Sequence, residues 1–265
     1  MLHHRRTSEN HSLPVPSLEP VIPSLVLGVI GMNVFAVVLV IARARAFHRP
    51  LYRPMLLNIG LSILPVFVLV VGLVATLVSL AASRGDAVDS PMHVLSVVIA
   101  VVSALVWLLL LPNASYLITE LNLSHRTEDD PTPLWYDIVL VITLAMSGVL
   151  NLVVNVLAVQ VLYGVMRYPD DDVAGLTQPD TRLVAVAIIM LSAVGVYLGR
   201  YLRLNSWDVT HPGSFLRKVR DHFTQQGAVR TFLGFTLVHT VFIALLYLTI
   251  GGTIIDLVVA YQQSR

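Results

Sequence analysis

Residues 54–83 read PMLLNIGLSILPVFVLVVGLVATLVSLAAS, thirty consecutive positions without Asp, Glu, Lys or Arg. A helix needs about 20 apolar residues to cross the hydrocarbon core of a bilayer, so this stretch is long enough to span a membrane. Five further intervals of 17 to 30 residues also lack these four residue types. They are 20–42, 90–119, 138–166, 183–199 and 231–255. The sequence therefore predicts six transmembrane helices.

The composition leads to the same class of protein. Hydrophobic residues make up 56% of the 265 positions and charged residues 12%, whereas soluble domains carry roughly 25% charged residues. The chain has too few charges to cover a water-facing surface, which excludes a soluble enzyme and a nucleic-acid-binding module. It has no cysteine, which excludes a disulfide scaffold and thiol catalysis. The predicted fold is an all-α integral membrane protein.

We expect a single membrane domain over residues 21–260, preceded by a mobile tail over 1–20. The expected spans are 21–42, 56–81, 92–111, 137–163, 183–202 and 231–256. The third is expected to end at Pro112-Asn113, because both residue types break helices. Between the last two spans, SFLRKVRDHF (214–223) places apolar side chains on one helical face and basic ones on the rest. This pattern predicts a short amphipathic helix at the interface, lying on anionic headgroups, or else an ordinary amphipathic linker.

The distribution of basic residues predicts the orientation. Eleven of the 17 basic residues lie in the loops 43–55, 112–136 and 200–230, and the side richer in Lys and Arg faces the cytoplasm. Both termini are then outside, in a bacterial cytoplasmic (inner) membrane. The expected partners are the lipid bilayer and its anionic headgroups. We expect no nucleic-acid partner, no cofactor and no metal ion, and the sequence identifies no protein partner.

Three polar clusters lie at span ends on this cytoplasmic side. They are PNASYLITEL (112–121), WYD (135–137) and GRYLRLNSWD (199–208). An arginine pair can hold a planar oxyanion by bidentate hydrogen bonds, so we expect a ligand-binding site in which an Arg–Asp network joins the third, fourth and fifth spans. The alternative is structural, because aromatic residues and arginines at span ends also serve as anchors. The candidate residues are Asn113, Tyr116, Thr119, Glu120, Trp135, Asp137, Arg200, Arg203, Asn205 and Asp208.

Polar residues also occur inside the expected spans. Four of them recur every fourth position in the fourth span and so form a stripe on one helical face. They are Thr143, Ser147, Asn151 and Asn155. Asparagine in hydrocarbon needs a partner, so the stripe forms interhelical hydrogen bonds or lines a hydrated path.

Two further features lie in the last two spans. His239 is an ionisable residue within the sixth span, a position that suggests function by default. We expect it to be neutral and bonded to a hydroxyl, for example one from the stripe of the fourth span. In the fifth span, Gly195-x-x-x-Gly199 allows a neighbouring helix to approach closely, either inside the bundle or in a second copy.

The polar clusters also carry a resemblance. PNASYLITEL (112–121), WYD (135–137) and GVYLGRYLRLNSWD (195–208) resemble a family of bacterial multi-pass membrane proteins catalogued as a domain of unknown function. The resemblance implies the same membrane class and singles out the same three clusters. It implies no reaction.

Three functions remain open at this point. The first is binding or transport of a small anionic or lipid-headgroup ligand at the cytoplasmic face. The second is a membrane-embedded enzyme that acts on a lipid-linked substrate, with Glu120, Asp137 or Asp208 as general base. The third is a structural or partner-docking role, in which the motifs brace the bundle.

Overall fold

The computed structural model describes residues 21–83, 90–120, 131–169, 174–202 and 212–263. These residues form α-helices joined by short turns, with no strand among them. The α-helices are α1 (Val21–Ala46), α2 (Arg53–Ala82), α3 (Pro91–Tyr116), α4 (Leu134–Arg167), α5 (Pro179–Tyr201), α6 (Pro212–Phe223), α7 (Ala228–Tyr247) and α8 (Thr253–Gln263). The 3-10 helices are η1 (Leu117–Glu120) and η3 (Ala174–Thr177), and η5 (Leu248–Gly252) is a π-helix.

Six helical runs are long and apolar enough to cross a membrane. They are Pro23–Ala46, Arg53–Ala82, Pro91–Thr119, Leu134–Arg167, Pro179–Tyr201 and Ala228–Gln263. The prediction of an all-α, multi-pass membrane protein is thereby confirmed. The amphipathic segment between the last two spans is also helical, as α6.

Proline marks where several of these helices begin. Pro54, Pro91 and Pro179 each occupy the first turn of their helix, where the missing N–H would have no partner inside the helix and the fixed φ angle suits the helical conformation. At the start of α3, the Ser90 side chain also accepts a hydrogen bond from the backbone N–H of His93, which caps the helix.

The expected end of the third span at Pro112-Asn113 is wrong. α3 continues through Pro112 to Tyr116 and is followed at once by η1. Proline inside a helix removes one backbone hydrogen bond, but membrane helices tolerate it because neighbouring helices and local 3-10 turns compensate. Pro112 has such a neighbour, since its ring packs directly against Gly195 of α5.

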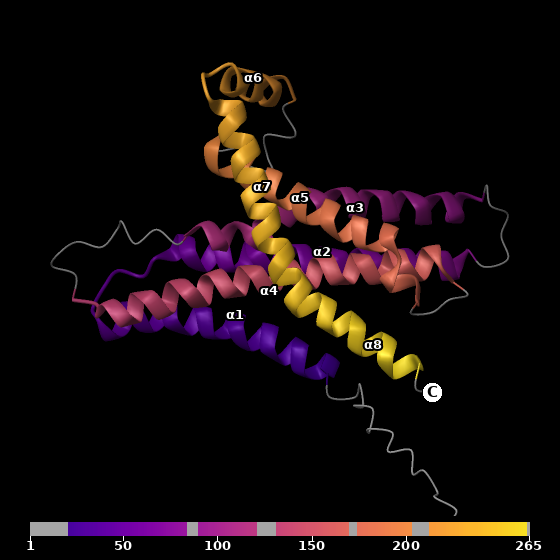
Figure 1. Cartoon of the computed structure of the whole chain (residues 1–265), viewed down its shortest axis with the longest axis horizontal. Coiled ribbons are helices and arrows are strands. Elements are labelled where there is room, and N and C mark those ends of the chain that lie inside the picture. The colour runs from indigo at the N-terminus through magenta and orange to yellow at the C-terminus, as the bar shows by residue number, and fades with distance from the viewer. Residues whose placement is uncertain (1–20, 84–89, 121–130, 170–173, 203–211, 264–265) are drawn as a thin grey trace, which may run out of the picture.

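α4 is the central helix of the bundle. It contacts α1, α2, α3 and α5, and its residues Leu152, Val153 and Val156 are buried in the main apolar core together with Trp107 and Ile189. In Figure 1, α2 and α3 run side by side as a hairpin, and α7 and α8 cross the other helices obliquely. The first turns of α4 consequently lie beside the ends of α1 and α3.

Small residues set the closest contacts between helices. A Cβ atom on Gly195 would overlap the Pro112 ring, and one on Gly72 would meet the side chain of Ser103. Ser79 and Ser96 join α2 to α3 by a hydrogen bond of 2.8 Å between their hydroxyls. The close approach expected at Gly195 therefore serves packing inside the bundle.

An aromatic cluster attaches α6 to the bundle. The hydroxyl of the buried Tyr197 lies 2.8 Å from Nε2 of His222, and its ring packs edge-on against Phe232 and Phe235 of α7. Phe223 at the end of α6 also packs on Phe232. The C-terminal end of α6 is thus held at the junction of α5 and α7.

Candidate functional site

The first predicted cluster lies where α3 passes into η1. Asn113, Tyr116 and Thr119 are all partly buried there, and their spacing of three brings them to a similar side of the helix. The Thr119 hydroxyl donates a hydrogen bond of 2.7 Å to the carbonyl oxygen of Tyr116. The Thr119 backbone carbonyl accepts a hydrogen bond from a different residue.

That donor is Arg200, at the end of α5. Its Nη1 donates a hydrogen bond of 2.6 Å to the Thr119 carbonyl oxygen, while the side chain as a whole is exposed. The bond joins the ends of the third and fifth spans, as the sequence suggests, but through a backbone carbonyl and not an acid. The hydrogen bond to Thr119 therefore fixes the position of an exposed guanidinium.

Asp137 lies in the first turn of α4 and is buried. Arg43 of α1 donates a hydrogen bond of 2.8 Å from Nε to the Asp137 carboxylate. The expected Arg–Asp network joins the third, fourth and fifth spans, whereas this ion pair brings in the first. Arg43 is not among the predicted site residues, although it is the first charged residue after the apolar stretch of α1.

The aromatic residues beside Asp137 differ in their roles. Tyr136 is buried, and its hydroxyl donates a hydrogen bond of 2.8 Å to the carbonyl oxygen of Leu39 in α1. Its ring packs edge-on against Phe47 and Trp135. Trp135 itself is 64% exposed, which suits an aromatic residue at the membrane interface.

Several candidates lie outside what the structure describes. Arg203, Asn205 and Asp208 fall between the described ranges, and the side chain of Glu120 is not described either. The described part of the predicted site therefore consists of the α3–η1 turn, the start of α4 and the end of α5.

The polar stripe of α4 forms direct hydrogen bonds to other helices. Asn151 exchanges hydrogen bonds of 2.9 and 3.0 Å with Asn33 of α1, and its Nδ2 also donates to the hydroxyl of Ser62 in α2. Ser147 donates to the same Asn33 oxygen at 2.8 Å. These groups are all buried, so they join three helices in the middle of the bundle.

The bonding continues along α4 toward its other end. Asn155 accepts a hydrogen bond of 2.8 Å from the indole N–H of Trp107 in α3, and its own amide donates to the Asn151 carbonyl. Further on, the buried Gln160 accepts a hydrogen bond from Tyr247 of α7. The stripe thus supports the interhelical interpretation. The sequence analysis does not predict Gln160 and Asn33, although each is an amide within a charge-free apolar stretch.

A comparison with known protein families assigns the chain to one of them. The model of one family matches residues 57–246, which is well over half of the chain. The chain belongs to the family described as Protein of unknown function (DUF1361). The resemblance found in the polar motifs is thereby confirmed at the level of the family. No curated protein and no solved structure matches the chain.

The DUF1361 region covers most of the bundle but not α1. It contains all three polar clusters and the stripe of α4. Arg43 and Asn33, which pair with Asp137 and Asn151, lie before its first residue. These two polar contacts therefore cross from the matched region to the first helix.

His239 of the DUF1361 region is bonded differently from the prediction. Its Nδ1 lies 3.0 Å from the carbonyl oxygen of Phe235, to which it can only donate, and its ring stacks on that of Phe235. The expected bond to a hydroxyl of the α4 stripe is wrong. The acceptor is the carbonyl one turn earlier in the same helix.

The opposite end of the bundle carries its own polar cluster, which joins α4 to α5. Tyr163 and Tyr168 both donate hydrogen bonds to the Asp180 carboxylate, at 3.2 and 2.9 Å. The bond to Asp180 raises the pKa of the Tyr168 phenol, because it stabilises the protonated form. These hydrogen bonds join the C-terminal end of α4 to the start of α5. The sequence analysis does not predict them.

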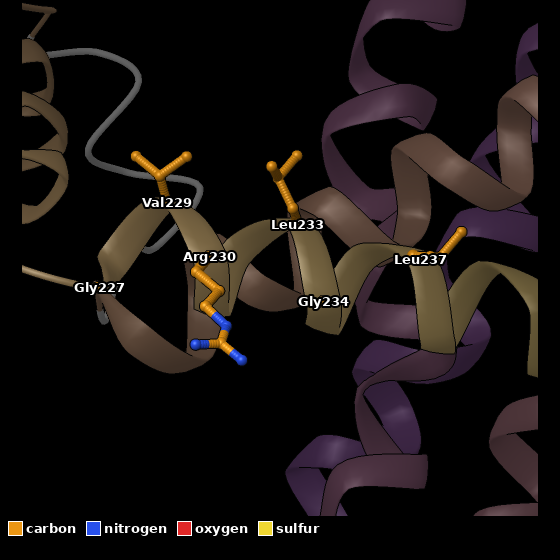
Figure 2. Close-up of a pocket in the computed structure, with 6 residues that line it drawn as sticks. All are labelled: Gly227, Val229, Arg230, Leu233, Gly234 and Leu237. Atoms are coloured by element: carbon orange, nitrogen blue, oxygen red, sulfur yellow. The ribbon is translucent and has the colours of Figure 1, made fainter.

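The remaining candidates for a site are few. Among the described residues, no group of three or more His, Asp or Glu side chains is placed to hold a metal ion. A shallow hollow lies along α7 (Figure 2). Its lining residues, all from the start and first half of this helix, are Gly227, Val229, Arg230, Leu233, Gly234 and Leu237. Among the described residues, this hollow and the exposed Arg200 are two places where a ligand could contact the protein.

Proposed function

We propose that this integral membrane protein binds an anionic group of the phosphate type, carried by a small ligand or a lipid headgroup, at the end of the bundle that contains Arg200. The observation that carries the proposal is the exposed Arg200 guanidinium, fixed by its bond to the Thr119 carbonyl. A guanidinium fixed in this way loses less conformational entropy when it binds an oxyanion than a freely rotating one.

Exposed arginines at the ends of other helices support an anionic ligand. Arg45 and Arg53 are exposed at the end of α1 and the start of α2, and both helix ends lie at the same end of the bundle as the start of α4 (Figure 1). We call this end, with Arg45, Arg53 and Arg200, the basic end. Such a surface attracts anions by its combined field.

The basic end faces the cytoplasm in the proposed orientation, and both termini face outward, in a bacterial inner membrane. The positive-inside rule supports this assignment. α6 supports it too, because Arg217, Lys218 and Arg220 are exposed along its length, and basic side chains of this kind bind anionic headgroups of the cytoplasmic leaflet.

Binding accounts for the described geometry better than acid–base catalysis or transport. A general base needs a carboxylate that is open to its substrate, whereas the Asp137 carboxylate is buried and paired with Arg43. A transport path along α4 needs polar groups that face water, whereas Asn33, Ser62 and Asn151 bond to one another. Exposed arginines such as Arg200 remain accessible for binding a ligand.

Thermal unfolding of the full-length protein tests the proposal. Inorganic pyrophosphate is titrated onto protein in a neutral detergent, and in a second arm the protein is placed in nanodiscs of phosphatidylglycerol or phosphatidylcholine. A ligand that binds only the folded state raises the unfolding midpoint. Stabilisation by pyrophosphate indicates a soluble anion, and stabilisation only by phosphatidylglycerol indicates a headgroup.

Arg200→Ala and Arg182→Ala form a matched pair for this experiment. Both arginines are exposed and both belong to α5, but Arg182 lies at the opposite end of the helix. We expect Arg200→Ala to lose most of the stabilisation and Arg182→Ala to keep it. Equal stabilisation in both variants, or none in the unsubstituted protein, would contradict the proposal.

A further inference from the structure

The hollow along α7 has a lining that the packing of the bundle does not explain. A Cβ atom on Gly234 would meet nothing within 4 Å, so no neighbouring helix requires a glycine there. Glycine is also a poor helix former. Beside it, Leu233 and Leu237 are 59% and 65% exposed. The hollow is thus an apolar surface that opens away from the protein.

The opposite face of α7 is the one that packs against the bundle. Phe232 and Phe235 contact Tyr197 of α5, and Ile243 and Tyr247 are buried in the main core. Among the described residues, these contacts lie on the inward face of α7. The outward face of α7 contacts the lipid or protein that surrounds the bundle in the membrane.

Arg230 gives this outward face a charge at one end. It is exposed, it lies in the first turn of α7, and it directly precedes the charge-free interval 231–255. Among the described residues it has no hydrogen-bond or ion-pair partner. Figure 2 shows its side chain extending away from the helix, on the side opposite to the Val229 and Leu233 side chains.

A cation at one end of an apolar groove matches the chemistry of an anionic phospholipid. From Arg230 to Leu237 the helix rises about 10 Å, enough for part of one acyl chain. We propose that the hollow of α7 binds an anionic phospholipid of the surrounding leaflet, with its phosphate on Arg230 and an acyl chain along Gly234 and Leu237. Arg230 is not one of the residues of the basic end, so this proposal does not depend on the ligand proposed there.

Native mass spectrometry of the full-length protein can count the bound lipids. Protein in a neutral detergent is titrated with phosphatidylglycerol or with phosphatidylcholine. Arg230→Ala is compared with Arg182→Ala, which removes an exposed arginine from the other end of the bundle. Gly234→Leu is compared with Gly28→Leu, because Gly28 in α1 also has open space around its Cβ position.

We expect Arg230→Ala to weaken the tightest phosphatidylglycerol binding about tenfold and to leave phosphatidylcholine binding unchanged. Gly234→Leu fills the hollow and should weaken the binding of both lipids, whereas both control variants bind as the unsubstituted protein does. Wild-type lipid binding in Arg230→Ala or in Gly234→Leu would overturn the proposal. A dimer that Gly234→Leu converts to a monomer would also overturn it, because a second copy would then fill the hollow.

Discussion

α4 and α2 are both apolar membrane helices, yet they occupy opposite environments. α4 is the less hydrophobic of the two, and 56% of its most apolar stretch is buried in the protein, against 17% for α2. In a soluble protein the more hydrophobic helix would be the buried one. Lipid reverses this order, because hydrocarbon accepts apolar side chains but cannot satisfy polar ones.

The same rule applies within a single helix. In α2, Ser62 is buried and bonded to α4, while Phe67 and Val70 are 62% and 54% exposed. In α4, the buried face carries Asn151 and Asn155. The polar residues of these spans therefore mark the faces that pack against other helices.

The largest test of this difference removes the guanidinium of α1 that pairs with the buried Asp137 of α4. Arg43→Leu leaves the Asp137 side chain, which is 7% exposed, without the guanidinium. We expect the free energy of unfolding to fall by about 3 kcal/mol. Titration with sodium dodecyl sulfate in mixed micelles measures it, with the exposed Arg53→Leu of α2 as control. Equal losses in both variants would contradict the contrast between the two helices.

The second test removes the amide at the centre of the stripe. Asn151→Leu breaks the bonds to Asn33 and Ser62, and each interhelical bond contributes about 0.6 kcal/mol on average. We expect a loss of about 2 kcal/mol in the same unfolding titration. Val70→Leu, on the lipid-facing side of α2, should change stability by almost nothing. A neutral Asn151→Leu would show that the stripe does not hold the helices together.

The smallest effect is expected from adding one methyl group. In Gly195→Ala the new Cβ overlaps the rigid Pro112 ring, so α3 and α5 must separate, and we expect a loss of about 1 kcal/mol. The same substitution in α2, Gly60→Ala, meets open space and should be neutral. Thermal unfolding of the two variants side by side is the measurement. A stabilised Gly195→Ala would mean that the two helices are not in tight contact.

The six spans and the inward direction of the stripe could be predicted from the sequence, because charge-free length and period-four spacing are local properties. The partner of each polar group could not. Asp137 is paired by Arg43 and Asn151 by Asn33, residues more than 90 positions away. Only the packing of α1 against α4 determines these pairs.

Two predictions from the local sequence are wrong: the end of the third span at Pro112-Asn113 and the hydrogen-bond partner of His239. Pro112 does not end α3, because a membrane helix can continue through a proline where neighbouring helices and local 3-10 turns offset the missing bond. His239 reaches the carbonyl of Phe235 in its own helix before it can reach another. At the predicted site, Arg200 and Thr119 do come together, but through the backbone, which the side-chain pattern does not encode.

The apolar part of the last membrane helix is longer than the hydrocarbon core is thick. Its charge-free interval, 231–255, is about 38 Å long as a helix, whereas the hydrocarbon core is roughly 30 Å thick. Such a helix tilts to bury its apolar surface. In Figure 1 this helix crosses the other helices obliquely. We expect a thicker membrane to make it more upright and a thinner one to move its two ends apart in the plane.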